Sequence, residues 1–216
     1  MKLFVWDFHG VLEKDNELAV LDISNRVLEQ AGYTERLSAK DSQEYYGLKW
    51  YQYFERLLPN LSTDQHMALQ AACFRFAEQN LHILADHIRP NDHAHEILEA
   101  IELAGHDQII VSNTRQQDLL WFVQAIGIEQ YFPEEKVFGV NAHQTHSAKK
   151  DALQKYLATK PDTSIVIVGD SAGDMELKEV QGGTTYFYTH PHLTPSTQKS
   201  AADFYISDLR AMLREL

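Results

Sequence analysis

Four short runs of apolar residues constrain the fold of this chain more than any other feature. Each run is rich in β-branched and aromatic residues and is ended abruptly by a polar residue or a glycine, which is typical of buried β-strands. The runs cover residues 3–6, 109–111, 165–168 and 186–188. Weaker runs at 137–140 and 204–206 predict a fifth strand and an edge strand. Because apolar residues are continuous within each run, the pattern indicates a parallel sheet covered on both faces.

Apolar residues at helical spacing lie between the later strands and predict three helices. They cover residues 94–104, 119–126 and 148–157. Asn91 and Ser147 are the expected N-caps of the first and third helix, and Gly105 and Gly127 are expected to end the first and second. Strands that alternate with helices in this way predict a doubly wound, Rossmann-like α/β fold, in which ligands bind at the carboxyl ends of the strands.

Residues 16–87 interrupt this alternation. Met67, Ala71, Phe74 and Leu81 recur at helical spacing, and no convincing strand occurs there. We therefore predict a small all-helical domain at 16–87, inserted into an α/β core formed by residues 1–15 and 88–216. Because the insertion leaves the core directly after the first strand, we expect it to act as a lid over the carboxyl edge. Residues 203–216 are predicted to add a short strand and a helix to the sheet.

Charge and cysteine content exclude several classes of protein. The chain has 19 lysine and arginine residues against 31 aspartate and glutamate residues, and its net charge is -12. Such a chain repels nucleic acid and anionic lipid, so we expect neither as a partner. The single cysteine, Cys73, excludes an intramolecular disulfide and favours a reducing compartment. No apolar stretch is long enough for a membrane span or a signal peptide, so we expect a cytoplasmic protein.

Short polar side chains end three of the predicted strands. Asp7 follows the first strand, Ser112 the second and Asp170 the third. In a parallel sheet these strand ends lie on one edge, so the three residues are expected to converge in one pocket despite their separation in the sequence.

Motifs around these residues resemble those of the haloacid dehalogenase (HAD) superfamily. The segment FVWDFHGVL, residues 4–12, resembles its first motif, and IIVSN, residues 109–113, resembles its second. The segment IVIVGDSAGD, residues 165–174, resembles its fourth motif, and Lys149 or Lys150 lies where the lysine of the third is expected. The four motifs occur in the family's order, with a helical insertion after the first. The chain therefore resembles HAD-like phosphatases with a helical cap.

The resemblance implies a Mg²⁺-dependent phosphomonoesterase that works through an aspartyl-phosphate on Asp7. A carboxylate ionised at neutral pH can attack phosphorus, but its charge repels a phosphate dianion, so the site needs a hard cation. By resemblance, the metal ligands are Asp7, the backbone carbonyl of His9, Asp170 and Asp174.

Further residues are expected to hold the phosphate. By resemblance, Ser112 donates a hydrogen bond to a phosphate oxygen, and a lysine neutralises charge on the transferring group. We favour Lys149, because the residues after it resemble the helix start that follows the family's lysine, and Lys150 is the alternative. Asn113 and Arg115 lie near enough in the sequence to contact the substrate.

His9 departs from the family pattern, because phosphatases of this superfamily ordinarily carry a second aspartate there. An imidazole can donate a proton as the cation and accept one when neutral, so we predict that His9 is the general acid and base. Two alternatives stay open. A 2-haloacid dehalogenase also lacks the second aspartate but needs no Mg²⁺, and a weakly catalytic binding module would keep only the fold and the metal.

The substrate is less constrained than the chemistry. Six aromatic residues cluster around Gly47, and they predict either a core for the insertion or a surface for an aromatic leaving group. They are Tyr45, Tyr46, Trp50, Tyr51, Tyr53 and Phe54. A phosphorylated small molecule and a phosphotyrosine-type substrate both fit, and the oligomeric state stays open. The histidine pairs His93/His95, His143/His146 and His190/His192 lack the spacing of a zinc helix and are expected at the surface.

Overall fold

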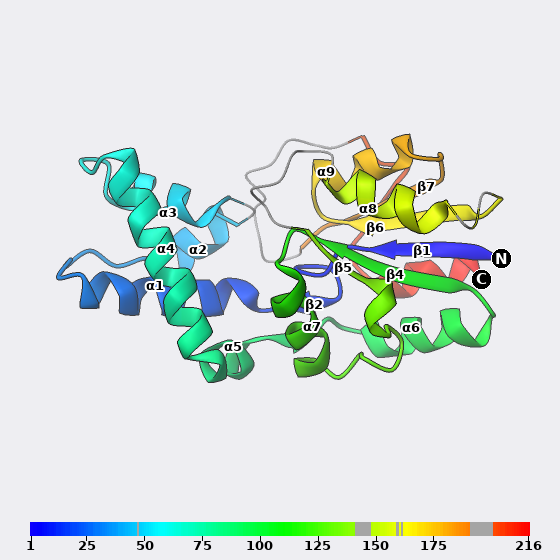
Figure 1. Cartoon of the computed structure of the whole chain (residues 1–216), viewed down its shortest axis with the longest axis horizontal. Coiled ribbons are helices and arrows are strands. Elements are labelled where there is room, and N and C mark those ends of the chain that lie inside the picture. The colour runs from blue at the N-terminus through cyan, green and yellow to red at the C-terminus, as the bar shows by residue number, and fades with distance from the viewer. Residues whose placement is uncertain (47, 141–147, 159, 161, 191–200) are drawn as a thin grey trace. The chain divides into compact units, whose positions relative to one another are not determined.

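The computed structural model describes residues 1–46, 48–140, 148–158, 160, 162–190 and 201–216 (Figure 1). The described chain forms two compact units. An α/β unit is made of Met1–Lys14 and the described parts of Arg89–Pro191 and Lys199–Leu216. A helical unit is made of Asp15–Ile88.

A six-stranded parallel sheet forms the centre of the α/β unit and confirms the predicted fold class. Its order is β5-β4-β1-β6-β7-β8, and every neighbouring pair is parallel. The strands are β1 Lys2–Trp6, β4 Asp107–Ser112, β5 Val137–Gly139, β6 Ser164–Gly169, β7 Thr184–Tyr188 and β8 Phe204–Ile206. The weaker runs therefore do form strands, one beside β4 and one at the edge beyond β7.

The central position of β1 sets the place of the residues that follow it. Val5 is in register with Ile109 of β4 on one side and with Ile167 of β6 on the other. Trp6 is in register with Val168 in the same way. The carboxyl ends of these three strands therefore lie at nearly the same level of the sheet.

Helices cover both faces of this sheet, with α8 and α9 on one face and α6 on the other (Figure 1). Their bounds are α6 Ala94–Leu103, α7 Gln116–Ala125, α8 Ala148–Leu157 and α9 Ala172–Met175, with 3-10 helices η1 Glu134–Lys136, η2 Glu176–Glu179 and η3 Leu209–Glu215. Under α8 and α9 lies a buried cluster of Leu3, Val5, Ile109, Val111, Leu153, Leu157, Ile165, Ile167, Met175, Leu177 and Phe187. Burial of both faces explains why the strands are continuously apolar.

Several local expectations are corrected by the structure. The N-cap of α6 is His93, in the left-handed region at φ 63°, and not Asn91. The N-cap proposed for α8, Ser147, lies outside the described residues. Gly105 and Gly127 follow the ends of α6 and α7 with positive φ, as expected. The C-terminal helix is a 3-10 helix, η3, and not an α-helix.

A two-stranded antiparallel ribbon was not predicted from the sequence. It pairs β2, Glu13–Lys14, with β3, Arg89–Pro90. Two residues are too few to show a period, so no apolar pattern marks these strands. The buried Asn91 follows β3 and links it to the residues before β2. Its backbone N–H donates to the carbonyl of Leu12 at 2.8 Å, and its side-chain amide donates to the carbonyl of Val11 at 2.8 Å.

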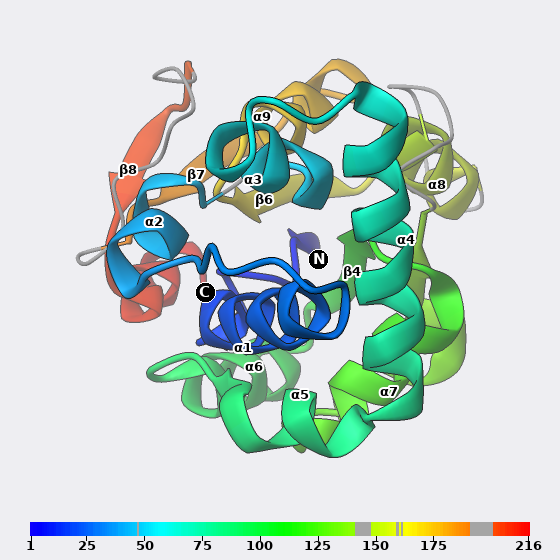
Figure 2. The same ribbon diagram turned by 90° about the vertical axis from the view of Figure 1, so that its left-hand side faces the viewer.

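The described part of the helical unit contains five α-helices, in the region where the sequence predicted helices and no strand. They are α1 Asn16–Gln30, α2 Ala39–Glu44, α3 Trp50–Leu57, α4 Thr63–Gln79 and α5 Leu81–His87. Figure 2 shows α1 between α4 and α5, and α1 packs against both. Of the predicted aromatic cluster, Tyr53 and Phe54 are buried in this unit, and the Trp50 indole donates to the Ser24 hydroxyl at 2.6 Å. Much of the cluster therefore serves the unit's own core.

Candidate active site

Three carboxylates come together at the carboxyl edge of the sheet. Asp7 follows β1, and its backbone N–H donates to the carbonyl of Val168 in β6 at 2.9 Å. Asp170 follows β6, and Asp174 lies one turn later in α9. Oxygen atoms of the three side chains lie within 4.8 Å of one another. This is the convergence that the strand order requires of residues far apart in the sequence.

The Lys149 ammonium group lies between two of these carboxylates. Its Nζ is 2.9 Å from Asp7 Oδ1 and 2.6 Å from Asp174 Oδ1, and only 8% of its side chain is exposed. Lys150, the neighbouring residue on α8, points elsewhere and pairs with Glu179 and Glu176. Successive residues on a helix face different directions, so only one of the two lysines contacts the carboxylates.

The charged groups of this cluster shift one another's pKa values. Burial and the charge of Asp174 raise the pKa of Asp7 to about 7, although Lys149 opposes the shift. Burial alone would lower the pKa of Lys149, but the charges of Asp174 and Asp7 outweigh it and raise that pKa. Lys149 contacts two of the three carboxylates and His190 contacts the third, so three carboxylates face one ammonium group and one imidazole. Oxygen ligands in such a cluster suit a hard divalent cation such as Mg²⁺.

The residues expected to contact phosphate or substrate near β4 lie at its end and just after it, in different surroundings. Ser112 is the last residue of β4, and its buried hydroxyl lies 3.2 Å from the hydroxyl of Thr114. Asn113 is exposed. Arg115 is the N-cap of α7 and pairs with Asp118 at 2.6 Å, on the exposed surface of the helix start. Of this group, Ser112 is the one held by the sheet itself.

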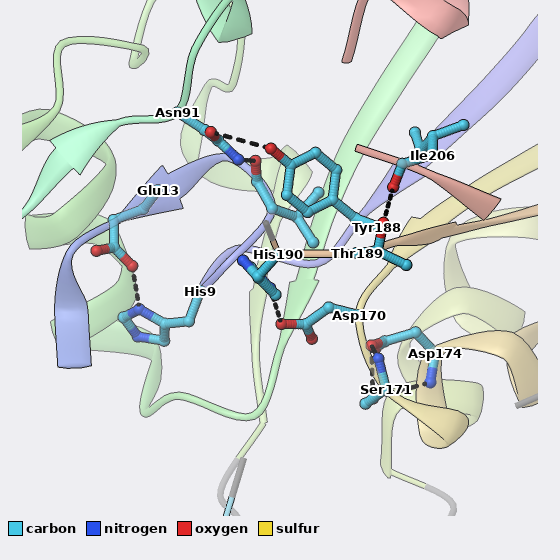
Figure 3. A network of polar contacts seen from close by, with 11 residues as sticks. His9, Glu13, Asn91, Asp170, Ser171, Asp174, Tyr188, Thr189, His190 and Ile206 are labelled. Carbon is cyan, nitrogen blue, oxygen red and sulfur yellow. Dashed lines mark hydrogen bonds and ion pairs between the residues drawn. The ribbon is translucent and has the colours of Figure 1, made fainter. Parts of the chain in front are cut away.

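The His9 ring lies against a buried carboxylate (Figure 3). Its Nδ1 is 2.8 Å from Glu13 Oε2, and Glu13 is completely buried. Burial alone would lower the pKa of His9, but the hydrogen bond and charge of Glu13 outweigh it and raise that pKa. Sequence reasoning missed Glu13. The available signal was an acidic residue four positions after His9, directly behind the apolar Val11 and Leu12.

His190 was also missed, because the paired histidines were expected at the surface. Its Nε2 lies 2.9 Å from Asp170 Oδ2, and only 11% of its side chain is exposed (Figure 3). The expectation was therefore wrong for His190, which follows β7 directly after Thr189. His93 does lie near the surface, where it pairs with Glu96. His143, His146 and His192 lie outside the described residues.

Comparison with known proteins gives the family of this chain. The family model of the haloacid dehalogenase-like hydrolases matches residues 4–182. The chain belongs to this family. A search of curated proteins finds no match for the hydrolase. None of its described helices is both long and apolar enough to cross a membrane.

Solved structures with the same fold are numerous but distant in sequence. A haloacid dehalogenase-like family hydrolase from Streptococcus pneumoniae aligns with a TM-score of 0.79 at 15% identity, over 100% of this hydrolase and 98% of that chain. A predicted phosphoglycolate phosphatase from Haemophilus somnus aligns with a TM-score of 0.76 at 18% identity, over 100% and 97%. Protein Tyrosine Kinase A from Mycobacterium tuberculosis aligns with a TM-score of 0.74 at 17% identity, over 99% and 96%. These similarities establish the fold of the hydrolase.

Gly169 allows Asp174 to reach the cluster. The Ser171 hydroxyl donates to Asp174 Oδ2 at 2.6 Å, in a capping box that opens α9. A Cβ at Gly169 would lie 2.2 Å from the Cβ of Asp174 and 2.5 Å from its Cγ. The end of β6 therefore has to be a glycine if Asp174 is to keep its place.

We predict that Gly169→Ala destabilises the hydrolase, because the new methyl group displaces the Asp174 side chain. Overpacking of this kind costs about 1–3 kcal/mol in the free energy of unfolding, which urea denaturation would measure. Gly173→Ala is the matched control, since its Cβ would meet nothing closer than Ser171 Oγ at 3.8 Å. Equal stability of the two variants would contradict this account of Gly169.

Proposed function

We propose that this hydrolase is a Mg²⁺-dependent phosphatase that cleaves a phosphomonoester through an aspartyl-phosphate on Asp7. One observation carries the proposal: the Asp7 carboxylate lies beside the Lys149 ammonium group, within 4.8 Å of both Asp170 and Asp174. A nucleophile, a cationic phosphate ligand and an acidic cluster thus share one edge of the sheet.

In the first step, an oxygen of the Asp7 carboxylate attacks phosphorus while the bond to the leaving oxygen breaks. His9 donates a proton to that oxygen, and the raised pKa of its ring favours the protonated form. In the second step, His9 accepts a proton from water as the water oxygen attacks the same phosphorus. Phosphate is released, and Asp7 returns to its starting state.

Lys149 and Ser112 are proposed to bind oxygens of the transferring group. A buried ammonium group offsets charge that spreads over these oxygens, and a hydroxyl at the end of β4 adds a hydrogen bond. Asn113, which is exposed beside Ser112, is proposed to contact the substrate.

Asp7, Asp170, Asp174 and the backbone carbonyl of His9 are proposed to hold the Mg²⁺ ion. When bound, the ion would supply the positive charge that lets an anionic carboxylate approach a phosphate dianion. Burial and the charges of Asp174 and Asp170, which raise the pKa of Asp7, support this fit. The same need for a cation argues against a dehalogenase, because displacement of halide does not use one.

The helical unit is proposed to be the family's cap, on the basis of its position in the sequence between β2 and β3. We propose a phosphorylated small molecule or a phosphotyrosine-type compound as substrate and a cytoplasmic location. The net charge of -12 makes the chain unsuited to a polyanionic partner.

We predict that the protein hydrolyses para-nitrophenyl phosphate with Mg²⁺ and loses this activity with a chelator. Asp7→Asn should lower kcat by at least about 10³-fold, because the amide is a poor nucleophile. The assay is a steady-state measurement of released nitrophenol, extended to phosphosugars, nucleotides, phosphorylated small acids and phosphotyrosine peptides.

Three results would contradict the proposal. Turnover by Asp7→Asn at the wild-type rate would exclude Asp7 as nucleophile. Absence of hydrolysis of every phosphate ester would favour a binding module, and halide release from a 2-haloacid in chelator would favour a dehalogenase.

The adjacent lysines provide a matched pair of variants. We predict that Lys149→Met lowers kcat/KM for the aryl phosphate by about 10²-fold or more, because phosphate loses a buried cationic partner. Lys150→Met removes only partly exposed ion pairs with Glu176 and Glu179 and should change kcat/KM by less than about twofold. Circular dichroism would check that both variants are folded. A larger loss from Lys150→Met than from Lys149→Met would reverse the assignment.

A further inference from the structure

The contact between His9 and Glu13 is unusual because the carboxylate is completely buried. Glu13 has no exposed surface, and its Oε2 is 2.8 Å from His9 Nδ1. Removing a carboxylate from water is costly unless a hydrogen-bonding or charged partner offsets the loss of hydration. The contact of Glu13 with the imidazole of His9 provides a partner that offsets the cost of burying its carboxylate (Figure 3).

Two aromatic rings hold the imidazole from other sides. The rings of Phe8 and Phe122 meet it edge to face, with centroids 5.2 Å and 5.0 Å away. Both phenylalanines are buried, with Phe8 before His9 in the chain and Phe122 on α7. The carboxylate and the two rings together restrict the rotation of the His9 side chain.

Hydrogen bonds close the backbone between His9 and Glu13 into a tight loop. The N–H groups of Val11, Leu12 and Glu13 all donate to the carbonyl of Phe8, at 3.3, 3.0 and 3.1 Å. The Asn91 side chain fixes the Val11 carbonyl, and the Tyr188 hydroxyl contacts Asn91 Oδ1 at 3.3 Å (Figure 3). These hydrogen bonds hold the backbone between the two residues of the pair.

We propose that Glu13 is a positioning residue for His9, which it holds as the Nδ1–H tautomer. A carboxylate accepts hydrogen bonds, so Nδ1 carries the proton that points to Glu13, and Nε2 carries the lone pair of the neutral ring. The inference rests on the proposed function, in which His9 transfers protons. It adds that Nε2 is the atom that does so.

The proton balance closes without any change on Glu13. Nε2–H of the imidazolium gives its proton to the leaving oxygen as the ester bond breaks and Asp7 is phosphorylated. Nε2 then takes a proton from water as the oxygen–phosphorus bond forms and the bond to Asp7 breaks. The Nδ1–H bond to Glu13 is kept in both steps, as expected for a carboxylate that orients an imidazole.

We predict that Glu13→Gln lowers kcat by about 10- to 100-fold and changes KM by less than about threefold, because it disturbs the proton donor and not substrate binding. The matched control is Glu96→Gln, which alters a histidine–carboxylate contact of 2.9 Å at His93, where the two side chains are 35% and 55% exposed. The control should keep the wild-type kcat and KM.

Nitrogen NMR of ¹⁵N-histidine protein measures the tautomer directly, at a pH where the ring is neutral. The wild-type spectrum should show His9 protonated at Nδ1, and Glu13→Gln should show a mixture of tautomers. Protonation of the wild-type ring at Nε2 would overturn the proposal, and this measurement needs no variant to fold and no substrate.

A double-mutant cycle separates this inference from the proposed function. If Glu13 acts through His9, then Glu13→Gln should cause no further loss of kcat in a His9→Ala background. A full additional loss there would overturn the positioning role. A wild-type rate in Glu13→Gln, with Asp7-dependent hydrolysis intact, would likewise overturn it and leave the phosphatase proposal standing. Failure of the phosphatase proposal would show as no hydrolysis at all, with the tautomer still measurable.

Discussion

Three carboxylates and one buried ammonium group come together where β1 and β6 end. Burial and the charge of Asp174 raise the pKa of Asp7, and Lys149 offsets only part of this effect. Much of the surrounding structure serves to keep this cluster in place. Gly169 makes room for Asp174, and the capping box at Ser171 fixes its second oxygen. Such a concentration of like charge lowers stability in return for a site that attracts cations.

The sheet explains why so much of the site could be predicted from sequence. A parallel strand buried on both faces is continuously apolar, so its end is marked by the first polar residue. Parallel order then brings Asp7 and Asp170 to one edge whatever lies between them in the chain. The sequence did not determine whether Lys149 or Lys150 contacts the carboxylates. The family's pattern favoured Lys149, but the direction in which each side chain leaves α8 decides the contact.

Other features depend on pairings that no local pattern encodes. Glu13 is buried because it meets His9, and its acidity alone predicts exposure. His190 was expected at the surface and instead contacts Asp170, because it lies two residues after the end of β7. Asn91 was expected to be the N-cap of α6. Its side-chain amide donates instead to the carbonyl of Val11, and its backbone N–H donates to the carbonyl of Leu12.

The fold alone does not decide the reaction. Its similar structures include one described as a phosphatase and one described as a tyrosine kinase, at identities of 18% and 17%. The chemistry has to come from the residues at the sheet edge. Here those residues are Asp7, the proposed nucleophile, Lys149, and the contacting pair His9 and Glu13.

Chemical trapping of the covalent intermediate tests the role of Asp7 most directly. The protein would be mixed with an aryl phosphate and Mg²⁺, quenched in acid and reduced with borohydride, which converts an acyl phosphate to an alcohol. Peptide mass spectrometry should then find the reduced residue at Asp7 in the wild type and nowhere in Asp7→Asn. Release of phosphate without modification of Asp7, or modification of another residue such as His9, would contradict the account.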